Sequence, residues 1–449
     1  MAGDRVRIGS GAGFAGDRWE PAVELVERGG IDYIAFECLA ERTIARETLA
    51  LRRGQGSGYN PQLEDRMRAV LPPAAAQDVC VLSNMGAADP LAAGRKTAEI
   101  AAELGLDDRR CAVLLGDDVQ DAVAARPDLP LMETNAPLES ILPRMASANA
   151  YLGADAVAAA LDTGAPVVVT GRVADPSLFV GPIVHALGWN YDDYVRLAQA
   201  TATGHLLECA GQVTGGYFAD PGVKDVAGLA RLGFPYADVT AEGEVTIGKC
   251  DGSGGRIDAA TCTEQLLYEV ADPAAYVTPD CVLDMTGIAF REVGPDRVAV
   301  AGARAQARTD THKVSIGYFD GYLGEGLLSY GGPNAVARAR LAGEIVAERL
   351  GLRGFAYDAL DARLIGIDSL HGPGADDRAE PYEVRLRVTG RTQDRKAAEA
   401  VGFEVAALYT NGPAGGAGDA ASVREILAVQ SVLLPRDLVT PRVEVVDAG

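Results

Sequence analysis

One segment of the sequence combines residues that transfer protons with a glycine-rich turn. His205, one of only four histidines, is followed by Glu208 three positions later and by Cys209 four positions later. On a helix these positions share one face, so the three side chains can converge on one point. The segment then reaches Thr214-Gly215-Gly216-Tyr217, where glycine allows the backbone to approach a ligand closely. We therefore expect part of an active site here, in which Tyr217 either donates a proton or anchors the turn.

Three kinds of chemistry fit His205, Glu208 and Cys209. Histidine is the side chain most readily poised for general acid–base catalysis near neutral pH. A His-x-x-Glu pair can also ligate a divalent metal, but such a site needs further carboxylate ligands. Cys209 would serve as a nucleophile if His205 or a helix terminus lowered the pKa of its thiol. The alternative to all three is a buried histidine beside a cysteine that packs as a small apolar residue.

The elements that must position these residues repeat one pattern over the first 180 residues. Short apolar runs, each followed by a segment with helical spacing, predict strands that alternate with helices. Such alternation predicts an α/β fold, with a parallel sheet and helices on both faces in a Rossmann-like arrangement. The expected strands comprise residues 6–8, 33–36, 79–82, 111–115 and 167–170.

Polar or glycine-rich residues follow each of the five expected strands. Ligands of such sheets bind at the carboxyl ends of the strands, so we expect these residues to meet there. Glu37 is a second candidate proton carrier, paired with Glu41 as acid and base in unlike environments, and Asp175 is a third. Arg172 would hold a carboxylate or phosphate, or form a loop salt bridge with Asp175. The other candidates for binding substrate here are Gly9, Ser10, Gly11, Gly13, Asn84, Gly86, Asp117 and Gly171.

The first of these loops has the spacing Gly-x-Gly-x-Gly, from Gly9 to Gly13, between a strand and a helix. Its backbone N–H groups would suit a phosphate or carboxylate, and Glu37 or Glu41 lies near the position of the ribose-binding acid of nicotinamide sites. A plain tight turn is the alternative. Lys249 precedes the glycine-rich residues 252–255, which suit a mobile lid over a ligand. The sequence requires no cofactor and leaves a divalent metal or a nicotinamide cofactor as alternatives.

Composition and charge narrow the classes of partner. The formal net charge of −22 argues against nucleic acid and anionic membranes, because binding either needs a basic face. No segment approaches the roughly 18 apolar residues of a membrane span, and the N-terminal segment has no apolar signal region. The seven cysteines have no Cys-x-x-Cys spacing, which fits a reducing compartment. These features predict a cytoplasmic protein that acts on a small molecule, with a bacterial type of composition.

The 449 residues are too many for one hydrophobic core, which predicts several domains. We assign an α/β core domain to residues 1–235, a mixed α+β section that completes it to 236–362, and a small C-terminal α+β domain to 363–449. Within the last we expect a strand at 382–388, a helix at 393–401, a strand at 404–409 and, after the glycine-rich residues 411–418, a helix through 426.

Six segments carry a resemblance to a known family. They comprise residues 7–14, 36–43, 84–88, 170–177, 205–221 and 410–416. Together they resemble the acyclic terpene utilization family, AtuA, over essentially the whole chain, including its C-terminal part. That family takes its name from gene clusters that degrade citronellol- and geraniol-type compounds through acyl-CoA intermediates. The resemblance implies work on a branched or carboxylated acyl substrate, and it assigns no catalytic residue.

The residues and the resemblance together predict an enzyme. We expect a lyase or hydratase/dehydratase that acts on a carboxylated or acyl-thioester small molecule, such as an acyl-CoA or a terpenoid-like compound, by side-chain acid–base chemistry. One alternative is an NAD(P)-dependent oxidoreductase, suggested by the loop from Gly9 to Gly13. Another is a non-catalytic subunit that holds pathway intermediates for a partner enzyme. We also expect a homo-oligomer, since two-fold symmetric assemblies are the commonest.

Overall fold

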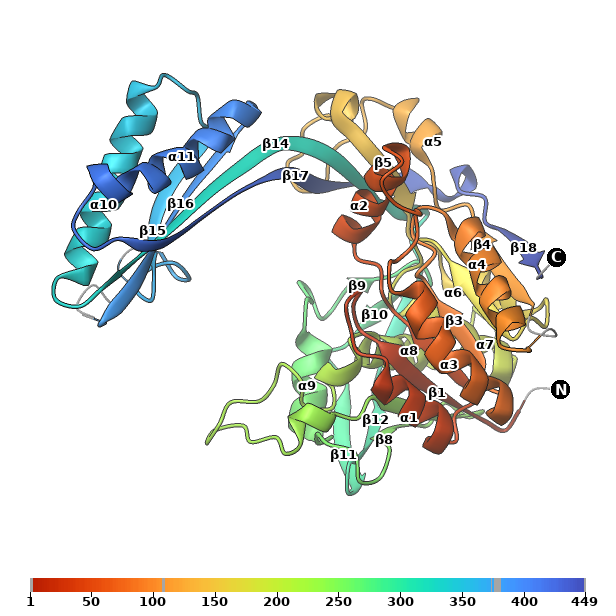
Figure 1. The fold of residues 1–449 in the computed structure, drawn as a ribbon. Coiled ribbons are helices and arrows are strands. Elements are labelled where there is room, and N and C mark those ends of the chain that lie inside the picture. The colour runs from red at the N-terminus through yellow and green to blue at the C-terminus, as the bar shows by residue number, and fades with distance from the viewer. Residues whose placement is uncertain (1–2, 107–109, 373, 375–380, 448–449) are drawn as a thin grey trace. The chain divides into compact units, whose positions relative to one another are not determined.

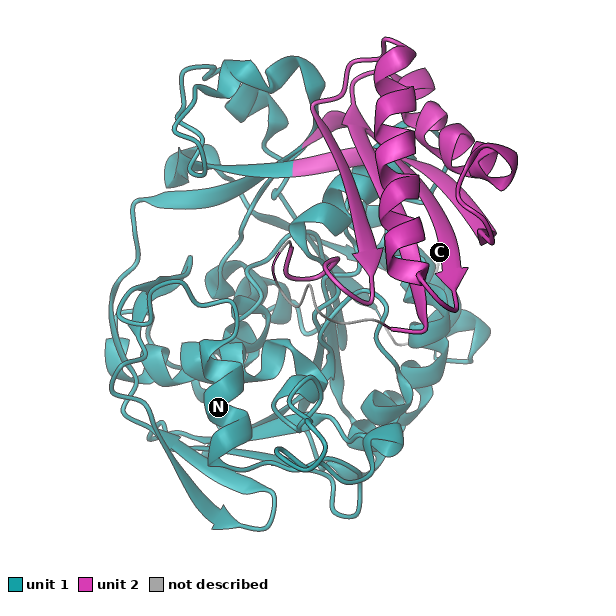
Figure 2. Ribbon diagram, turned by 90° about the vertical axis from the view of Figure 1, so that its left-hand side faces the viewer, with its two compact units in different colours: residues 1–317, 429–449 teal, residues 318–428 magenta. Residues whose placement is uncertain are grey.

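The computed structural model describes residues 3–106, 110–372, 374 and 381–447. It divides into two compact units (Figure 2): unit 1 comprises residues 1–317 and 429–449, and unit 2 comprises residues 318–428. Two long strands, β14 (Thr311–Gly331) and β17 (Ala417–Pro435), run through both units. The sequence predicts domain boundaries at 235/236 and 362/363. Whether the segments between these boundaries fold separately stays a prediction.

Unit 1 is built on a mixed sheet with the strand order β11-β12-β8-β7-β1-β2-β3-β6-β4-β18. Its five central strands run parallel to one another, as their alternation with helices predicts. Their apolar runs are almost entirely buried, as strands covered on both faces require. The central strands are β1 (Arg5–Ala12), β2 (Tyr33–Phe36), β3 (Cys80–Ser83), β6 (Val167–Thr170) and β4 (Cys111–Leu115).

Antiparallel strands extend this sheet on both sides. Beyond β1 lie four of them, and β18 pairs antiparallel with β4 at the other edge. The fold is therefore a mixed α/β fold, and its central order differs from the 3-2-1-4-5-6 order of the doubly wound dinucleotide-binding fold. The flanking strands are β7 (Pro235–Thr240), β8 (Val245–Lys249), β12 (Arg297–Ala301), β11 (Ala289–Gly294) and β18 (Arg442–Val446).

Helices cover both faces of the central strands (Figure 1). One group packs side by side against one face, and a second group packs against the other. The first group is α1 (Glu20–Arg28), α3 (Leu63–Gln77) and α4 (Pro90–Glu103), and the second is α6 (Ala154–Leu161), α7 (Ser177–Leu187) and α8 (Tyr194–Glu208). In the part of the chain that the structure describes, no helix is long and apolar enough to cross a bilayer.

Shorter elements complete unit 1. A three-stranded antiparallel sheet has the order β13-β10-β9, and β5 pairs with β14. These elements are α2 (Glu41–Arg52), α5 (Gln120–Ala124), α9 (Ala259–Leu267), β5 (Met145–Ala150), β9 (Tyr276–Val277), β10 (Cys281–Asp284) and β13 (Arg304–Ala307). Single 3-10 turns occur at Leu138–Ser140, Leu142–Arg144, Ala210–Gln212, Leu229–Arg231 and Arg436–Leu438.

Unit 2 is a four-stranded antiparallel sheet with two helices in the order β-α-β-β-α-β. The strand order β15-β16-β14-β17 and this alternation are typical of a ferredoxin-like unit. Its core buries apolar side chains of the helices against the sheet, such as Val346 and Val405 against Leu386. The elements are β15 (Ala359–Ile365), β16 (Glu383–Thr392), α10 (Ala335–Leu352) and α11 (Arg395–Asn411), with the outer parts of β14 and β17.

Two of the expected elements in this region are wrong. Residues 404–409, expected as a strand, continue α11, because Val401, Val405 and Leu408 recur on one helical face that is buried in the core. The residues after 418, expected as a helix, form β17, because pairing with β14 satisfies their backbone groups in the sheet. In both segments tertiary packing outweighs the local preference of the residues.

Helix α8, which carries His205 and Glu208, packs closely on the loop that follows β6. A Cβ atom on Gly204 would lie 2.5 Å from the carbonyl oxygen of Pro176, so only glycine fits at this contact. Asp193 caps the beginning of the helix by accepting a hydrogen bond from the backbone N–H of Arg196. The contact at Gly204 therefore sets the distance between α8 and the Asp175-Pro176 loop.

We expect Gly204→Ala to lower the melting temperature of unit 1. Alanine gains about 1 kcal/mol of helix propensity over glycine, but the clash with a backbone carbonyl costs roughly 1–3 kcal/mol as overpacking does. The matched control is Val195→Ala on the same helix, where the side chain is 74% exposed. Differential scanning calorimetry checks the prediction, and a higher melting temperature for Gly204→Ala would contradict the contact.

Candidate active site

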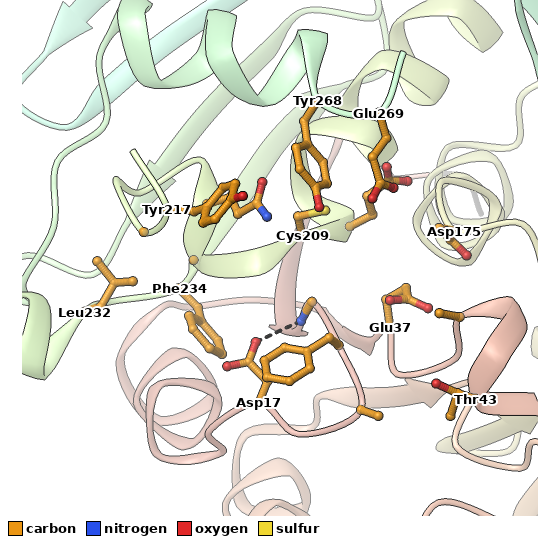
Figure 3. A pocket seen from close by; sticks show the side chains of 18 of the residues that line it. Asp17, Glu37, Thr43, Asp175, Cys209, Tyr217, Leu232, Phe234, Tyr268 and Glu269 are labelled. Atoms are coloured by element: carbon orange, nitrogen blue, oxygen red, sulfur yellow. Dashed lines mark hydrogen bonds between the residues drawn. The ribbon is translucent and has the colours of Figure 1, made fainter. Parts of the chain in front are cut away.

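A cleft in unit 1 lies where the chain leaves the carboxyl ends of β1, β2 and β6. It consists of two adjoining pockets of about 590 and 460 Å³, here called the first lobe and the second lobe. Both lobes are lined by Glu41, Asp175, Glu208 and Glu269, so they form one continuous cleft. In Figure 3 the N-terminal residues of the first lobe, such as Asp17 and Glu37, face Tyr217, Tyr268 and Glu269 across the cavity.

The structure brings together all six side chains expected to move protons or act as nucleophile. The residues that line the cleft are His205, Glu208, Cys209, Glu37, Asp175 and Tyr217, with Gly13, Arg172 and Gly216 from the expected substrate-binding set. The other expected substrate-binding residues do not line either lobe. They are Gly9, Ser10, Gly11, Asn84, Gly86, Asp117, Gly171, Thr214, Gly215 and Lys249.

Glu37 follows β2 directly and is held by hydrogen bonds to its own loop. Its Oε1 accepts from the backbone N–H of Leu39 at 2.9 Å and from Nδ2 of Asn84 at 3.0 Å. Asn84 is fully buried and also accepts from the backbone N–H of Cys38, so it fixes this carboxyl without facing the cavity. Burial, followed by the negative charge of Asp175, raises the pKa of Glu37 to about 8. Glu37 therefore holds its proton at neutral pH.

Glu41 is the first residue of α2. Its surroundings are positively charged, unlike those of Glu37. The hydroxyl of Tyr151 donates a hydrogen bond to Glu41 Oε1, and Lys313 Nζ lies 3.5 Å from the same oxygen. Burial acts to raise the pKa of Glu41, but the charge of Arg172 and the Tyr151 hydrogen bond outweigh it and lower the pKa to about 2. Two carboxyl groups of one lobe thus differ in protonation at pH 7, one neutral and one ionised.

Arg172 is a buried counter-ion to these acids, with 1% of its surface exposed. Its guanidinium donates to the carbonyl of Leu39, lies 2.9 Å from Asp175 Oδ1, and stacks 4.1 Å from the centre of the Tyr151 ring. Its backbone N–H donates to Asp117 Oδ2 at 2.9 Å. The loop salt bridge with Asp175, one of the two alternatives that the sequence offered for Arg172, is therefore confirmed, and the buried Nε of Arg172 has no hydrogen-bond partner among the described residues.

The side chain of Asp117 leaves no room for a side chain at Gly171, the residue before Arg172. Its carboxylate accepts from Arg172 and from Asn149 Nδ2, and a Cβ on Gly171 would lie 2.5 Å from Asp117 Oδ1. Burial raises the pKa of Asp117 to about 6. Asp117 and Gly171 therefore join the ends of β4 and β6 beneath the site, and neither residue contacts the cavity.

His205 and Glu208 form a buried hydrogen-bonded pair on α8. Nδ1 of His205 lies 2.7 Å from Glu208 Oε1, and Nε2 lies 3.0 Å from the carbonyl oxygen of Leu266. The carbonyl can only accept, so Nε2 carries a hydrogen and both ring nitrogens are occupied by protein groups. Burial acts to lower the pKa of His205, but the charge of Glu208 outweighs it and raises that pKa. His205 therefore holds Glu208 in place and reaches the substrate only through it.

Glu208 lines both lobes of the cleft and has one buried oxygen without a hydrogen-bond donor. The residue is 8% exposed, and its Oε2 accepts no hydrogen bond from any residue that the structure describes. Burial raises the pKa of this carboxyl, because the low-dielectric surroundings penalise its charged form. Glu208 is thus suited to receive a proton from a bound molecule.

Cys209 lies against the glycine-rich loop. A Cβ on Gly13 would come within 2.5 Å of the Cys209 backbone, so the two segments touch. Burial, followed by the charge of Glu208, raises the pKa of the Cys209 thiol above its ordinary value. A nucleophilic cysteine needs the opposite shift, so these surroundings favour a packing role.

The glycines of the first loop serve the packing of the chain itself. A Cβ on Gly11 would lie 2.5 Å from the Phe36 ring. The backbone N–H of Gly13 donates to Asp17 Oδ2 at 3.0 Å (Figure 3). Because a carboxylate already occupies this N–H and lines the lobe, the loop does not offer the anion cradle of a nicotinamide site.

Two other expectations concern a metal and a lid. Among the described residues, no group of three or more His, Cys, Asp or Glu side chains is arranged to hold a metal ion. Lys249 lies outside the cleft, where its Nζ donates to the carbonyl of Ser253 at 2.9 Å and pairs with Asp296 at 3.0 Å. That pairing fixes Lys249 against the glycine-rich residues 252–255, none of which lines either lobe.

The structure adds residues that the sequence did not single out. Tyr151 follows β5, a strand of small residues with no strong apolar signal, and Lys313 lies on β14 beside it. Tyr217 and Glu269 have backbone φ values of 60° and 58°, a region that bulky residues rarely adopt. Such strain clusters at functional sites, and both residues line the first lobe. The other additions are Asp17 and Tyr268.

We expect Glu37→Gln to stabilise the protein more at pH 9 than at pH 5. The folded pKa of about 8 exceeds the ordinary value of 4.5, so the folded state holds the proton more tightly than the unfolded state. That contribution to stability is complete below pH 4.5 and is lost as pH rises through 8. Glutamine does not ionise and avoids the loss. Melting temperatures across this range measure it, with exposed Glu344→Gln on α10 as control, and a constant difference would refute the shift.

No curated protein and no solved structure matches the chain. The model of the family described as "Acyclic terpene utilisation family protein AtuA" matches residues 6–445, which is nearly the whole chain and includes every residue of the cleft. The resemblance of the six segments is therefore confirmed, and the chain belongs to the acyclic terpene utilisation family AtuA.

Proposed function

We propose that this protein is a lyase of the hydratase/dehydratase class that acts on a branched, terpenoid-like acid or acyl thioester. The observation that carries the proposal is the pair of carboxyl groups in one lobe, with Glu37 neutral and Glu41 ionised at pH 7. Enzymes that both give and take protons need titratable groups whose environments separate their pKa values. Membership of a family described by acyclic terpene utilisation supports a substrate of this chain type.

In the hydration direction, Glu37 gives its proton to one carbon of a carbon–carbon double bond. Water adds its oxygen to the other carbon, and the proton that the water loses passes to Glu208 Oε2, which His205 holds in place. The products are an alcohol, an ionised Glu37 and a protonated Glu208. Proton exchange between these carboxyls and water restores the starting state, and dehydration is the same sequence reversed.

The lining of the cleft supports a substrate with an apolar chain. Phe14, Leu232 and Phe234 line the first lobe, and the Phe14 side chain is 60% exposed. Lys313 lines the second lobe with its side chain 43% exposed, which suits the carboxylate or thioester end of the substrate. The described lining of the first lobe contains acids and no lysine or arginine, so a phosphate-rich part of a thioester would lie outside it.

Glu37→Gln tests the proposal, since it keeps the shape and hydrogen bonds of the side chain but removes its proton. We expect turnover to fall at least about 100-fold, as loss of a general acid does. The assay follows incorporation of deuterium from D2O into acyclic branched alkenoic acids and their thioesters by NMR. Wild-type turnover should also decline as pH rises through 8, because Glu37 must be protonated.

Two results would count against this assignment. Full turnover by Glu37→Gln, with wild-type melting behaviour, would remove Glu37 as the acid. Binding of these compounds without any deuterium incorporation by the wild-type protein would favour a non-catalytic subunit that holds intermediates. The control is Val195→Ala, an exposed position on α8, which should turn over at the wild-type rate.

A further inference from the structure

The cleft is lined by far more acidic than basic side chains. Six carboxyl groups line its two lobes, whereas the lysines and arginines among its described lining residues are Arg172 and Lys313, both in the second lobe. Arg172 is already paired with Asp175, and Lys313 lies 3.5 Å from Glu41. The carboxyl groups are Asp17, Glu37, Glu41, Asp175, Glu208 and Glu269.

A second, independent feature points to a ligand at the junction of the lobes. Glu208 is more than nine-tenths buried and lines both lobes, yet its Oε2 has no hydrogen-bond donor among the described residues. The other oxygen is fixed by His205 at 2.7 Å, so the free oxygen cannot turn to find a protein partner without breaking that bond. A buried acceptor left without a donor is costly, and a bound molecule that supplies one removes the cost.

Aromatic rings line both lobes of the cleft. The Tyr276 ring lies 5.0 Å from the His205 ring in the second lobe, and Tyr217 and Tyr268 meet edge to face at 6.2 Å in the first. Tyr217 is 86% exposed although its backbone is strained, so its ring is held out at the cavity without packing into the core. Figure 3 shows Tyr217 and Tyr268 on the same wall as Glu269. Aromatic faces beside carboxylates are the surroundings that bind organic cations.

We propose that this cleft binds a compact positive charge carried on an apolar chain, with Glu208 Oε2 as its main partner and the tyrosine rings around it. The proposal rests on the proposed function, because positive charge develops on the branched carbon when Glu37 protonates a double bond. The same chemistry can come from an ammonium group that belongs to the substrate itself. In both cases the positive charge lies at the junction of the two lobes, beside Glu208, and the first lobe holds the apolar chain.

Calorimetric titration with a protonated tertiary amine on a branched acyclic alkyl chain tests the proposal. The neutral tertiary alcohol of the same shape is the reference ligand. We expect the ammonium compound to bind at least about tenfold tighter than the alcohol. Glu208→Gln, which keeps the shape of the side chain, should abolish that preference, while Glu344→Gln on α10 should keep it. Tyr217→Leu, at an exposed position, should reduce it without unfolding the protein.

Equal affinity for the amine and the alcohol would overturn the cation site, as would an unchanged preference in both Glu208→Gln and Tyr217→Leu. The alkene assay separates this result from failure of the proposed function. Ammonium preference together with alkene hydration supports charge that develops during the reaction. Ammonium preference without hydration supports a substrate that carries its own ammonium group. The hydratase assignment is then refuted, and the cation site is retained. Hydration without ammonium preference leaves the hydratase and refutes the cation site.

Discussion

The guanidinium of Arg172 is buried among carboxyl groups, and the charge state of the cleft depends on it. It pairs with Asp175, stacks on Tyr151 and acts through space on Glu41 and Glu37. A buried arginine is expensive to desolvate, so it persists only where several anions and hydrogen-bond acceptors surround it. Asp175 and the carbonyl of Leu39 provide such partners for the guanidinium, and Asp117 holds the Arg172 backbone at the end of β6.

The charge of Arg172 lowers the pKa of Glu41, whereas at Glu37 burial and the charge of Asp175 outweigh it and raise the pKa. Glu41 begins α2, receives the Tyr151 hydroxyl and is ionised, whereas Glu37 lies deeper beside Asp175 and is neutral. On the other wall, both ring nitrogens of His205 form hydrogen bonds with protein groups. One oxygen of Glu208 has no hydrogen-bond donor among the described residues. The groups left available for proton exchange in this cleft are therefore carboxyl groups, and the histidine holds one of them in place.

Part of this could be predicted from residue types and spacing. The five parallel strands were predictable because their β-branched and apolar runs are short, buried and separated by helical segments. The polar residues at their ends pointed to one edge of the sheet, where Glu37 and Asp175 do meet the cleft. Segment 404–409 and the residues after 418 were not predictable, because core packing in unit 2 and pairing with β14 decided them. Tyr151 and Lys313 lacked a signal, since a strand of small residues positions the first.

The sequence by itself determined the family, the alternation of strands and helices, and part of the set of residues that line the cleft, namely Glu37, Asp175, His205, Glu208 and Cys209. These follow from local residue patterns, which do not depend on what lies across the cavity. The tertiary structure alone decided the role of each residue. Whether Arg172 faces a ligand or its neighbours, which oxygen of Glu208 is free, and which carboxyl keeps its proton depend on burial and on charges brought from distant segments.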